Sequence, residues 1–467
     1  MKILLINPPL FNKNLRWDEQ SATYPPLGLM YIAAVLEQKN HNVVIFDGQA
    51  QNIFEEELEN YIKNENPLVV GITTITLMHK QILKCIDIIK EANKNIKIIL
   101  GGPHASLLKT KLMEMNSKID FIVKGESENT IIELIFEMEN EGKYAEISGI
   151  IFRKEGKIIE NKDRPLLDEL DNLPFPARHL LDITNSVYKS SFRYMRLPMT
   201  TMITTRGCPY ACLFCEHVFG RKYRGHSAEY IINEIEHLQK EYGIKEIQFV
   251  DDTFLLDPQK IKTFCNLILE KDIDLTWSCH GRIDVIYQNM ELINLIKKAG
   301  CWYISFGIES GNKDILTFLR KGINFKQVNE VINQVNKSGI FTKGYFMIGN
   351  PTETKETIND TINFAKSLKL DGVQFSLVMP LSNTEFYNIC AQYGTFDPNA
   401  YENMSSHSNE PVYLPHGLTK EYLKTIQKQA YKEFYIRPNY ILRQFFKIRD
   451  FNMFKRYLIK GLSYLGN

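Results

Sequence analysis

Three cysteines, Cys208, Cys212 and Cys215, lie within one run of eight residues, in a chain of 467 residues with eight cysteines in all. The chain starts with only four apolar residues before the polar Asn7, whereas the apolar core of a signal peptide has about 7–15. Without a secretion signal a disulfide framework is not expected, so thiols crowded at this spacing indicate a metal site. A zinc loop is the alternative, although zinc knuckles place two residues between paired cysteines and the gaps here are three and two.

The segment from Cys208 to Cys215 reads CPYACLFC and resembles the CxxxCxxC signature of radical S-adenosylmethionine (SAM) enzymes, including the aromatic Phe214 before the last cysteine. The resemblance implies a [4Fe-4S] cluster on the three cysteines, with one iron left open. In that family SAM chelates the open iron, and an electron from the cluster cleaves its sulfonium to give methionine and a 5′-deoxyadenosyl radical. A cluster-bearing sensor without turnover is the alternative from another class.

Four later motifs resemble strand-end motifs of the same family: Val250–Phe254 (VDDTF), Trp277–Arg282 (WSCHGR), Gly307–Gly311 (GIESG) and Phe346–Glu353 (FMIGNPTE). The residues implied to lie at SAM are Phe214, Asp251 and Asp252 (amino group), Arg282 (carboxylate or cluster), Glu309 and Ser310 (ribose) and Gly349 (adenine). Glu309 is the main ribose candidate because a carboxylate accepts from two vicinal hydroxyls at once. Structural roles stay open for five of them: helix caps for the two aspartates, ion pairs for Glu309 and Arg282, and a turn for Gly349.

The first 145 residues resemble the B12-binding domain that precedes the radical SAM domain in one subfamily. The matching pieces are Asn7–Pro9, Tyr24–Leu29, Gly71–Thr73, Gly101–His104 and Lys124–Glu126. The residues implied to contact cobalamin are Pro9, Gly28, Thr73, Thr74, Gly101, Gly102, His104, Gly125 and Glu126. Glycines at strand ends suit this ligand because they let the backbone approach a ring or a nucleotide tail closely.

One departure from many B12 proteins concerns histidine. The pattern Asp-x-His-x-x-Gly, whose histidine ligates cobalt, does not occur in the chain. A bound cobalamin is therefore expected to lack a histidine on its lower face. His104 has an alternative role as a loop or helix-capping residue, and a domain that binds no cobalamin is a further alternative.

Alternating strand-like and helix-like runs predict the element order that positions these residues. Short runs rich in Ile and Val, bounded by Gly, Pro, Asn or Asp, predict five strands at 3–6, 43–46, 69–72, 96–100 and 121–123, with helices such as 29–36, 82–92 and 130–139 between them. Such an order gives an α/β, doubly wound parallel sheet of the Rossmann-like, B12-binding type. Ligands bind at the carboxyl ends of its strands, where most of the cobalamin candidates lie.

Further strands are predicted at 200–204, 246–250, 275–278, 302–307, 342–348 and 372–377, and they indicate a partial (β/α)6 barrel. The helix at 228–242 has Ser227 as its expected N-cap. A hairpin at 149–160 and a proline-rich stretch separate the two halves. The expected domains are 1–145 (cobalamin-binding-like), 146–195 (hairpin and linker), 196–380 (radical SAM barrel) and 381–467 (basic and aromatic α-helical tail).

Net charge and hydropathy limit the classes of partner that the chain is expected to have. A net charge of +1 gives no pull toward nucleic acid, and no apolar run reaches the length of about 18 residues needed to span a membrane. In the tail, aromatic residues interleave with Lys and Arg: Tyr431, Phe434, Tyr435, Tyr440, Phe445, Phe446, Phe451, Phe454 and Tyr457. This suits either a helical lid on the barrel or a surface for anionic lipid. A cytoplasmic location is expected, with contact to a membrane surface left open.

The two resemblances together imply cobalamin-dependent methylation of an unactivated carbon. The alternative keeps both cofactors but cyclises, rearranges or oxidises a lipid-like or natural-product substrate. A small-molecule or lipid-like substrate and a flavodoxin- or ferredoxin-type electron donor are the expected partners. Methylthiotransferases, which also have a domain before the barrel, carry three further cysteines in it for a second cluster. The first 200 residues here hold only Cys85, which argues against membership of that branch.

Overall fold

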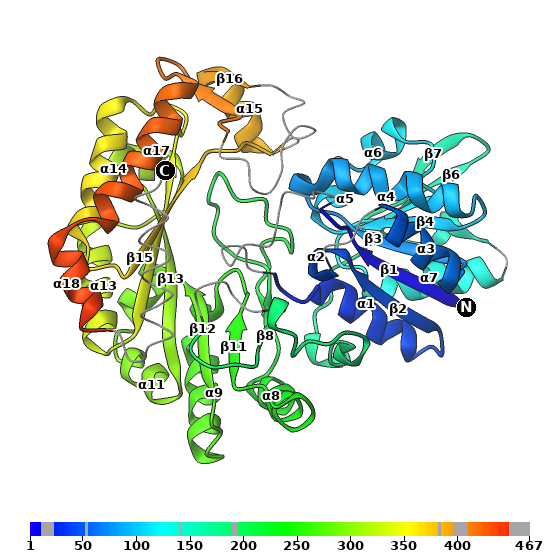
Figure 1. Ribbon diagram of the computed structural model, residues 1–467, viewed down its shortest axis with the longest axis horizontal. Coiled ribbons are helices and arrows are strands. Elements are labelled where there is room, and N and C mark those ends of the chain that lie inside the picture. The colour runs from blue at the N-terminus through cyan, green and yellow to red at the C-terminus, as the bar shows by residue number, and fades with distance from the viewer. Residues whose placement is uncertain are drawn as a thin grey trace. The chain divides into compact units, whose positions relative to one another are not determined.

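The computed structural model describes residues 1–10, 23–51, 55–140, 142–188, 194–381, 384–396 and 410–447. Their contacts divide the chain into two compact units (Figure 1). The described residues of 1–207 and 217–244 form the first unit, and those of 208–216, 245–398 and 409–467 form the second. The domain boundaries expected from the sequence stay predictions.

A seven-stranded sheet with the order β2-β1-β3-β4-β5-β6-β7 organises the first unit. Its five parallel strands are β1 (Lys2–Asn7), β2 (Asn42–Asp47), β3 (Val69–Thr73), β4 (Lys97–Gly101) and β5 (Phe121–Val123). All five were predicted, because each is a short Ile/Val-rich run that is buried in the sheet. The order reverses between β1 and β3, which makes this the switch point of a doubly wound sheet.

The predicted hairpin is present as β6 (Ile150–Lys154) and β7 (Lys157–Glu160). Its place in the fold could not be read from the sequence: β6 pairs antiparallel with β5 and so extends the first sheet. Phe121 and Phe152 lie opposite each other in this pairing, with ring centroids 6.5 Å apart. The hairpin thereby covers the edge that β5 would otherwise expose.

Helices cover both faces of this sheet. They are α1 (Leu27–Glu37), α2 (Gly48–Gln51), α3 (Glu55–Glu65), α4 (His79–Ala92), α5 (Pro103–Leu108), α6 (Thr110–Met115) and α7 (Glu128–Glu139). Helix α1 packs beside α7, and α3 packs beside α4 (Figure 1). Cys85 lies in the buried face of α4 within the hydrophobic core, and burial raises the pKa of its thiol. It is therefore a packing residue.

The remainder of the first unit joins the sheet to the cysteine segment. It contains 3₁₀ turns η1 (Thr76–Met78), η2 (Tyr144–Glu146), η3 (Leu170–Asn172), η4 (Arg178–Leu180) and η5 (Ser186–Tyr188), strands β8 (Met199–Met202), β9 (Thr205–Arg206) and β10 (Arg224–Gly225), and helix α8 (Ala228–Tyr242). The predicted N-cap of α8 is confirmed, since the Ser227 hydroxyl accepts from the Tyr230 N–H at 3.1 Å.

The second unit contains five parallel strands that pair in chain order: β11 (Glu246–Phe249), β12 (Thr276–Gly281), β13 (Cys301–Glu309), β14 (Phe341–Ile348) and β15 (Gly372–Leu377). The elements between them are η6 (Phe254–Leu256), α9 (Pro258–Glu270), α10 (Ile283–Gln288), α11 (Leu292–Lys298), α12 (Lys313–Phe318), α13 (Phe325–Lys337) and α14 (Lys355–Ser367). With β8, these are the six strands predicted for this half of the chain. Parallel order brings the carboxyl ends of neighbouring strands to one edge, where barrels of this kind place their chemistry.

The tail contains α15 (Glu385–Tyr393), β16 (Gly394–Phe396), β17 (Tyr413–Pro415), α17 (Lys420–Tyr435) and α18 (Pro438–Phe445). Helix α17 packs on β15: the Tyr431 hydroxyl accepts from the Phe375 N–H at 3.0 Å, and the Tyr435 hydroxyl accepts from the Val373 N–H at 3.0 Å. These bonds satisfy an edge strand, as expected for a helical cover. Phe451, Phe454 and Tyr457 lie outside the described residues. Among the described helices, none is long and apolar enough to span a membrane.

Stability of the first unit is expected to depend on the ion pair of Arg178 and Glu234, whose side chains are each 2% exposed. Arg178 Nη2 donates to Glu234 Oε1 at 2.9 Å, and Nη1 donates to the Thr200 hydroxyl at 3.1 Å. Arg178→Met leaves the Glu234 carboxylate buried and unpaired, and should lower the free energy of unfolding by about 3–5 kcal/mol. Urea denaturation measures this change.

The control is Lys118→Met, because Lys118 and its partner Asp87 in the same unit are 44% and 49% exposed. An exposed pair is worth about 1 kcal/mol or less. Equal losses of stability in the two variants would contradict the importance given to the buried pair.

Candidate active site

The cysteine segment is held in the second unit by its own hydrophobic residues. Cys212 is buried, Cys208 is partly exposed and Cys215 is exposed. Between them, Leu213 is 6% exposed, packs into a hydrophobic cluster with Leu319 and donates its N–H to the Leu319 carbonyl at 3.0 Å. Phe214 packs against the same cluster. The segment is thereby fixed although it contains no helix or strand of its own.

Within the described residues, no three His, Cys, Asp or Glu side chains form a group that could hold a single metal ion. The ligands of a mononuclear zinc site converge on one point. The cysteines of a cubane bind three different irons, so they need not converge in this way. The donor set of three thiols on one segment fits a cluster with an open iron.

Arg282 lies against the cysteine segment at the carboxyl end of β12. Its Nη1 is 3.6 Å from Cys212 Sγ, and its guanidinium carbon is 3.3 Å from the Tyr210 ring centroid. Asp284 holds the guanidinium in place, with Nε to Oδ1 at 2.9 Å. Burial disfavours the charged form, but Asp284 and Cys212 hold the pKa of Arg282 above its ordinary value. Of the two roles expected for Arg282, this geometry favours the one beside the cluster.

Glu309 ends β13 and is paired with a residue that sequence reasoning missed. Lys321 Nζ donates to Glu309 Oε1 at 2.9 Å, and both side chains are less than a tenth exposed. The register shifts between Gly307 and Glu309, and Glu309 has φ of +69°. Such a bulge re-aims a side chain at the end of a strand. A buried carboxylate requires a charged or hydrogen-bonded partner, and this rule was the available signal for Lys321.

Lys321 also connects Glu309 to the cysteine segment. Its Nζ lies 5.8 Å from the Phe214 ring centroid, and its carbonyl accepts from Arg282 Nη2 at 3.1 Å. The structure therefore brings three of the predicted residues, Phe214, Arg282 and Glu309, around one lysine. Ser310 is buried and bonds to the Thr361 hydroxyl at 3.0 Å, and it accepts from the Asn312 N–H at 3.1 Å.

The turn after β14 contains buried polar atoms that no residue in the described part of the chain satisfies. Glu353 Oε2 accepts from the N–H of Gly349 at 2.6 Å and from that of Asn350 at 2.8 Å. Burial raises the pKa of Glu353 to about 7. Among the described residues, neither polar atom of the Asn350 side chain nor Glu353 Oε1 has a hydrogen-bond partner. Buried groups without partners are costly in a native protein, so these atoms fit a site that a polar ligand such as a nucleoside completes.

The two aspartates after β11 differ in exposure: Asp251 is 1% exposed, whereas Asp252 is exposed. Neither caps α9. Its N-cap is Asp257, whose carboxylate accepts from the N–H groups of Gln259 and Lys260. Capping of this helix was the structural alternative for both residues, and the structure gives that role to Asp257.

In the first unit, the carboxyl ends of β3 and β4 lie side by side and carry Thr73, Thr74, Gly101 and Gly102. The Thr74 hydroxyl donates to the Gly101 carbonyl at 2.8 Å and accepts from the Ala105 N–H at 2.9 Å. Gly102 has φ of +95°, and a Cβ there would lie 2.9 Å from the Thr74 carbonyl oxygen. Only glycine suits that position.

His104, the one histidine among the cobalamin candidates, is buried and lies within hydrogen-bond distance of two side chains. Its Nε2 lies 2.9 Å from His79 Nδ1, and its Nδ1 lies 3.2 Å from the Thr76 hydroxyl. Burial, assisted by His79, lowers the pKa of His104 to about 4. The imidazole is therefore neutral at pH 7.

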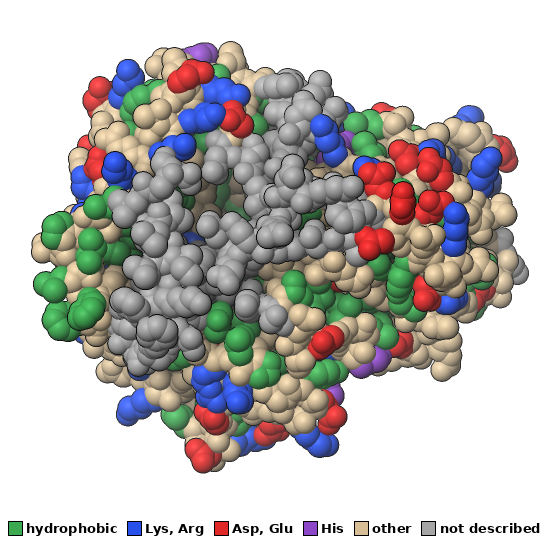
Figure 2. All heavy atoms as spheres, in the orientation of Figure 1, with side chains coloured by type: hydrophobic (Ala, Val, Ile, Leu, Met, Phe, Trp, Pro, Cys, Tyr) green, Lys and Arg blue, Asp and Glu red, His purple; other side chains and the backbone are tan. Residues whose placement is uncertain are grey.

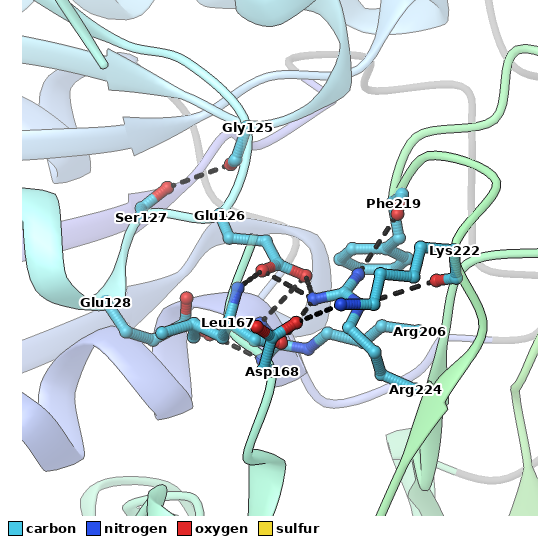
Figure 3. Close-up of polar contacts among 10 residues, drawn as sticks. All are labelled: Gly125, Glu126, Ser127, Glu128, Leu167, Asp168, Arg206, Phe219, Lys222 and Arg224. Atoms are coloured by element: carbon cyan, nitrogen blue, oxygen red, sulfur yellow. Dashed lines mark hydrogen bonds and ion pairs between the residues drawn. The ribbon is translucent and has the colours of Figure 1, made fainter. Parts of the chain in front are cut away.

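The other cobalamin candidates occupy different surroundings. Pro9 is buried after β1. At Gly28 in α1 and Gly125 after β5, none of the described residues lies within 4 Å of the place of a Cβ, which suits close approach of a ligand to their backbone. Glu126 is buried in a cluster of ion pairs with arginine side chains (Figure 3). The glycine-lined strand ends fit a large flat ligand, while Glu126 is already occupied by the protein.

Comparison with known proteins defines the class. The family model for the radical SAM superfamily matches residues 202–365, and that for the B12 binding domain matches residues 19–135. The chain is 33% identical over 467 residues to an uncharacterized methyltransferase of Pyrococcus horikoshii, covering 99% of this chain and 98% of that protein. The chain belongs to the same family as this methyltransferase, and its two domains are those of the cobalamin-dependent radical SAM enzymes.

Two further comparisons extend over most of the chain. The chain is 24% identical over 457 residues to an anaerobic magnesium-protoporphyrin IX monomethyl ester cyclase of Rubrivivax gelatinosus, covering 96% of this chain and 80% of that protein. Its fold matches the cobalamin-dependent SAM radical enzyme OxsB with a TM-score of 0.74 at 16% identity, covering 99% of this chain and 71% of that one. The predicted fold class is confirmed, and the expected cofactors, a [4Fe-4S] cluster, SAM and cobalamin, are those of the family.

Arg282 is expected to tune the cluster. A reduced cluster carries one more negative charge, which a buried cation stabilises, so Arg282→Gln should lower the reduction potential. One charge-assisted hydrogen bond is worth about 1.5–3 kcal/mol, which for one electron corresponds to roughly 60–130 mV. Anaerobic EPR-monitored titration without SAM measures the change in potential.

The control is Arg282→Lys, which keeps the charge and should shift the reduction potential less. An unchanged reduction potential in Arg282→Gln would show that Arg282 does not influence the cluster.

Proposed function

We propose that this chain methylates an unactivated carbon of a small molecule, with SAM as the source of both the radical and the methyl group. The observation that carries the proposal is the convergence of Arg282 and the Glu309–Lys321 pair on the cysteine segment in the second unit. The B12 binding domain and the relative named as a methyltransferase support methyl transfer over other outcomes.

The residues divide between the cofactors. Cys208, Cys212 and Cys215 would hold the cluster, and the strand-end residues of the first unit would hold cobalamin. When bound, the cluster supplies the electron that cleaves SAM, and cobalamin carries the methyl group. In this proposal the candidates at the ends of the second-unit strands, including Asp251, Asp252 and Ser310, contact SAM or shape its site.

The protein contributes orientation and charge. Arg282 places a positive charge beside the Cys212 sulfur, where a thiolate is needed. Lys321 restrains Glu309, so that its free oxygen accepts from ribose hydroxyls at small entropic cost. The unsatisfied amide of Asn350 offers a donor and an acceptor to the nucleoside. Buried Leu213 and the packed Phe214 anchor the segment between Cys212 and Cys215 to the hydrophobic core of the unit.

The proposed partners follow from the same reasoning. A flavodoxin- or ferredoxin-type protein in the cytoplasm would supply electrons, and the substrate would be a small or lipid-like molecule. The exposed apolar side chains of α18 support contact with a membrane surface: Ile441 is 54% exposed, Leu442 59% and Phe445 62%. Figure 2 shows hydrophobic side chains gathered on the surface over this helix. The packing of α17 on β15 supports the lid for the remainder of the tail.

A second candidate function is radical cyclisation with the same cofactors. It is favoured by the likeness to the cyclase of R. gelatinosus, which spans 96% of this chain. Cyclisation would use the same cluster and SAM residues but would not transfer a methyl group to the substrate.

Product analysis separates the two functions. With reductant, SAM carrying a deuterated methyl group and the substrate, methyl transfer should give 5′-deoxyadenosine and S-adenosylhomocysteine in equal amounts, because each turnover uses one SAM for the radical and one for the methyl group. The product should carry the labelled methyl group by mass spectrometry. Formation of 5′-deoxyadenosine without S-adenosylhomocysteine would reject methylation and favour cyclisation.

A further inference from the structure

Four buried charged residues of the first unit form a cluster at the two ends of the segment that carries the cysteines. Strand β9 precedes this segment and strand β10 follows it, and we call these two strands its stems. We call Glu126, Glu128, Arg206 and Arg224 the stem clamp. Glu126 follows β5 and Glu128 begins α7, whereas Arg206 and Arg224 lie in β9 and β10 (Figure 3). The side chains are 3–6% exposed, and the two positive and two negative charges balance.

The contacts within the clamp leave Glu126 fully engaged. Arg224 Nη1 donates to Glu126 Oε1 at 2.7 Å and to Oε2 at 2.8 Å, and the Leu167 N–H donates to Oε2 at 2.8 Å. Arg224 also donates to the carbonyls of Leu167 at 2.7 Å and Phe219 at 3.1 Å. Both carboxylate oxygens therefore accept from protein donors, which favours an internal role for Glu126 over contact with cobalamin.

Arg206 closes the clamp from the other stem. Its Nη2 donates to Glu128 Oε1, and its Nη1 is 3.6 Å from Glu126 Oε1. The guanidinium carbon lies 5.6 Å from the Tyr31 ring centroid and 5.5 Å from the Phe219 ring centroid. Although burial disfavours its charge, Glu128 holds the pKa of Arg206 above the ordinary value.

The backbone shows that the clamp grips both stems at one place. Strands β9 and β10 pair antiparallel, with Arg206 opposite Arg224. The next residue, Gly207, has φ of +83°, and a Cβ there would lie 2.2 Å from the Lys222 carbonyl oxygen. Cys208 follows directly in the sequence. The stems thus meet where the cysteine segment begins, and the clamp ties that point to β5 and α7.

We propose that the stem clamp is a positioning device for the cysteine segment, and that Glu126 and Arg224 act on the cluster through the backbone of the stems. Fixing both ends of a loop restricts the conformations that its ligands sample. Loss of the clamp should loosen the cysteines and speed the loss of iron. This consequence requires only that the segment holds a cluster; a second consequence, a higher ratio of 5′-deoxyadenosine to S-adenosylhomocysteine, rests on the proposed methyl transfer.

The experiment compares Arg224→Met with Asp168→Asn in the full-length, anaerobically reconstituted protein. Asp168 pairs with Lys222 between the same two segments, but the two side chains are 66% and 62% exposed, so its loss should change nothing. Iron release to a ferrous chelator and the EPR spectrum of the reduced cluster are the readouts. Arg224→Met should release iron roughly tenfold faster, the lower range for residues that support metal ligands, with a broadened spectrum.

Arg224→Lys keeps the positive charge but lacks the second guanidinium nitrogen, which donates to the Phe219 carbonyl, and it covers the case in which Arg224→Met fails to fold. It should show wild-type circular dichroism and iron release between that of wild type and Arg224→Met. Wild-type iron release and EPR spectrum in folded Arg224→Lys would overturn the proposal. Faster iron release in a protein that transfers no methyl group would uphold the clamp and reject the proposed function.

Discussion

The structure depends on a single constraint: a charge taken out of water must be paired. Removal of one partner from a buried pair costs about 3–5 kcal/mol, whereas an exposed pair contributes about 1 kcal/mol or less. In the first unit the constraint is met by the stem clamp, and in the second by Lys321 with Glu309 and by Arg282 with Asp284. Each pair lies at the end of a strand or beside the cysteine segment, so pairing and positioning are done by the same side chains.

The two units provide different chemistry at their strand ends. The first unit offers backbone and small residues, and its one candidate histidine is neutral and bonded to another histidine. The second offers thiols, a cation beside one of them, and buried polar atoms that have no hydrogen-bond partner among the described residues. A large ring system and a charged nucleoside need these two kinds of surroundings, respectively. The family membership of the chain agrees with this division.

Local sequence patterns predicted the strands, the Ser227 cap and a metal site at the three cysteines, because each depends on residues within a few positions of one another. The pairs of Arg224 with Glu126 and of Lys321 with Glu309 were not predicted, since hydropathy does not indicate which charged residue, distant in the sequence, pairs with a buried one. The same limit hid the addition of β6 to the first sheet. Glu126 shows the consequence: its motif suggested a ligand contact, and its partners are protein groups.

The central claim is that Cys208, Cys212 and Cys215 hold one cubane with an open iron. Mössbauer spectroscopy of anaerobically purified, ⁵⁷Fe-labelled protein tests it most directly. The wild-type chain should show a [4Fe-4S] cluster with about four irons, and addition of SAM should make the spectrum of one iron distinct from the others. Protein without cluster iron, or a triple alanine variant that keeps the same spectrum, would contradict the claim.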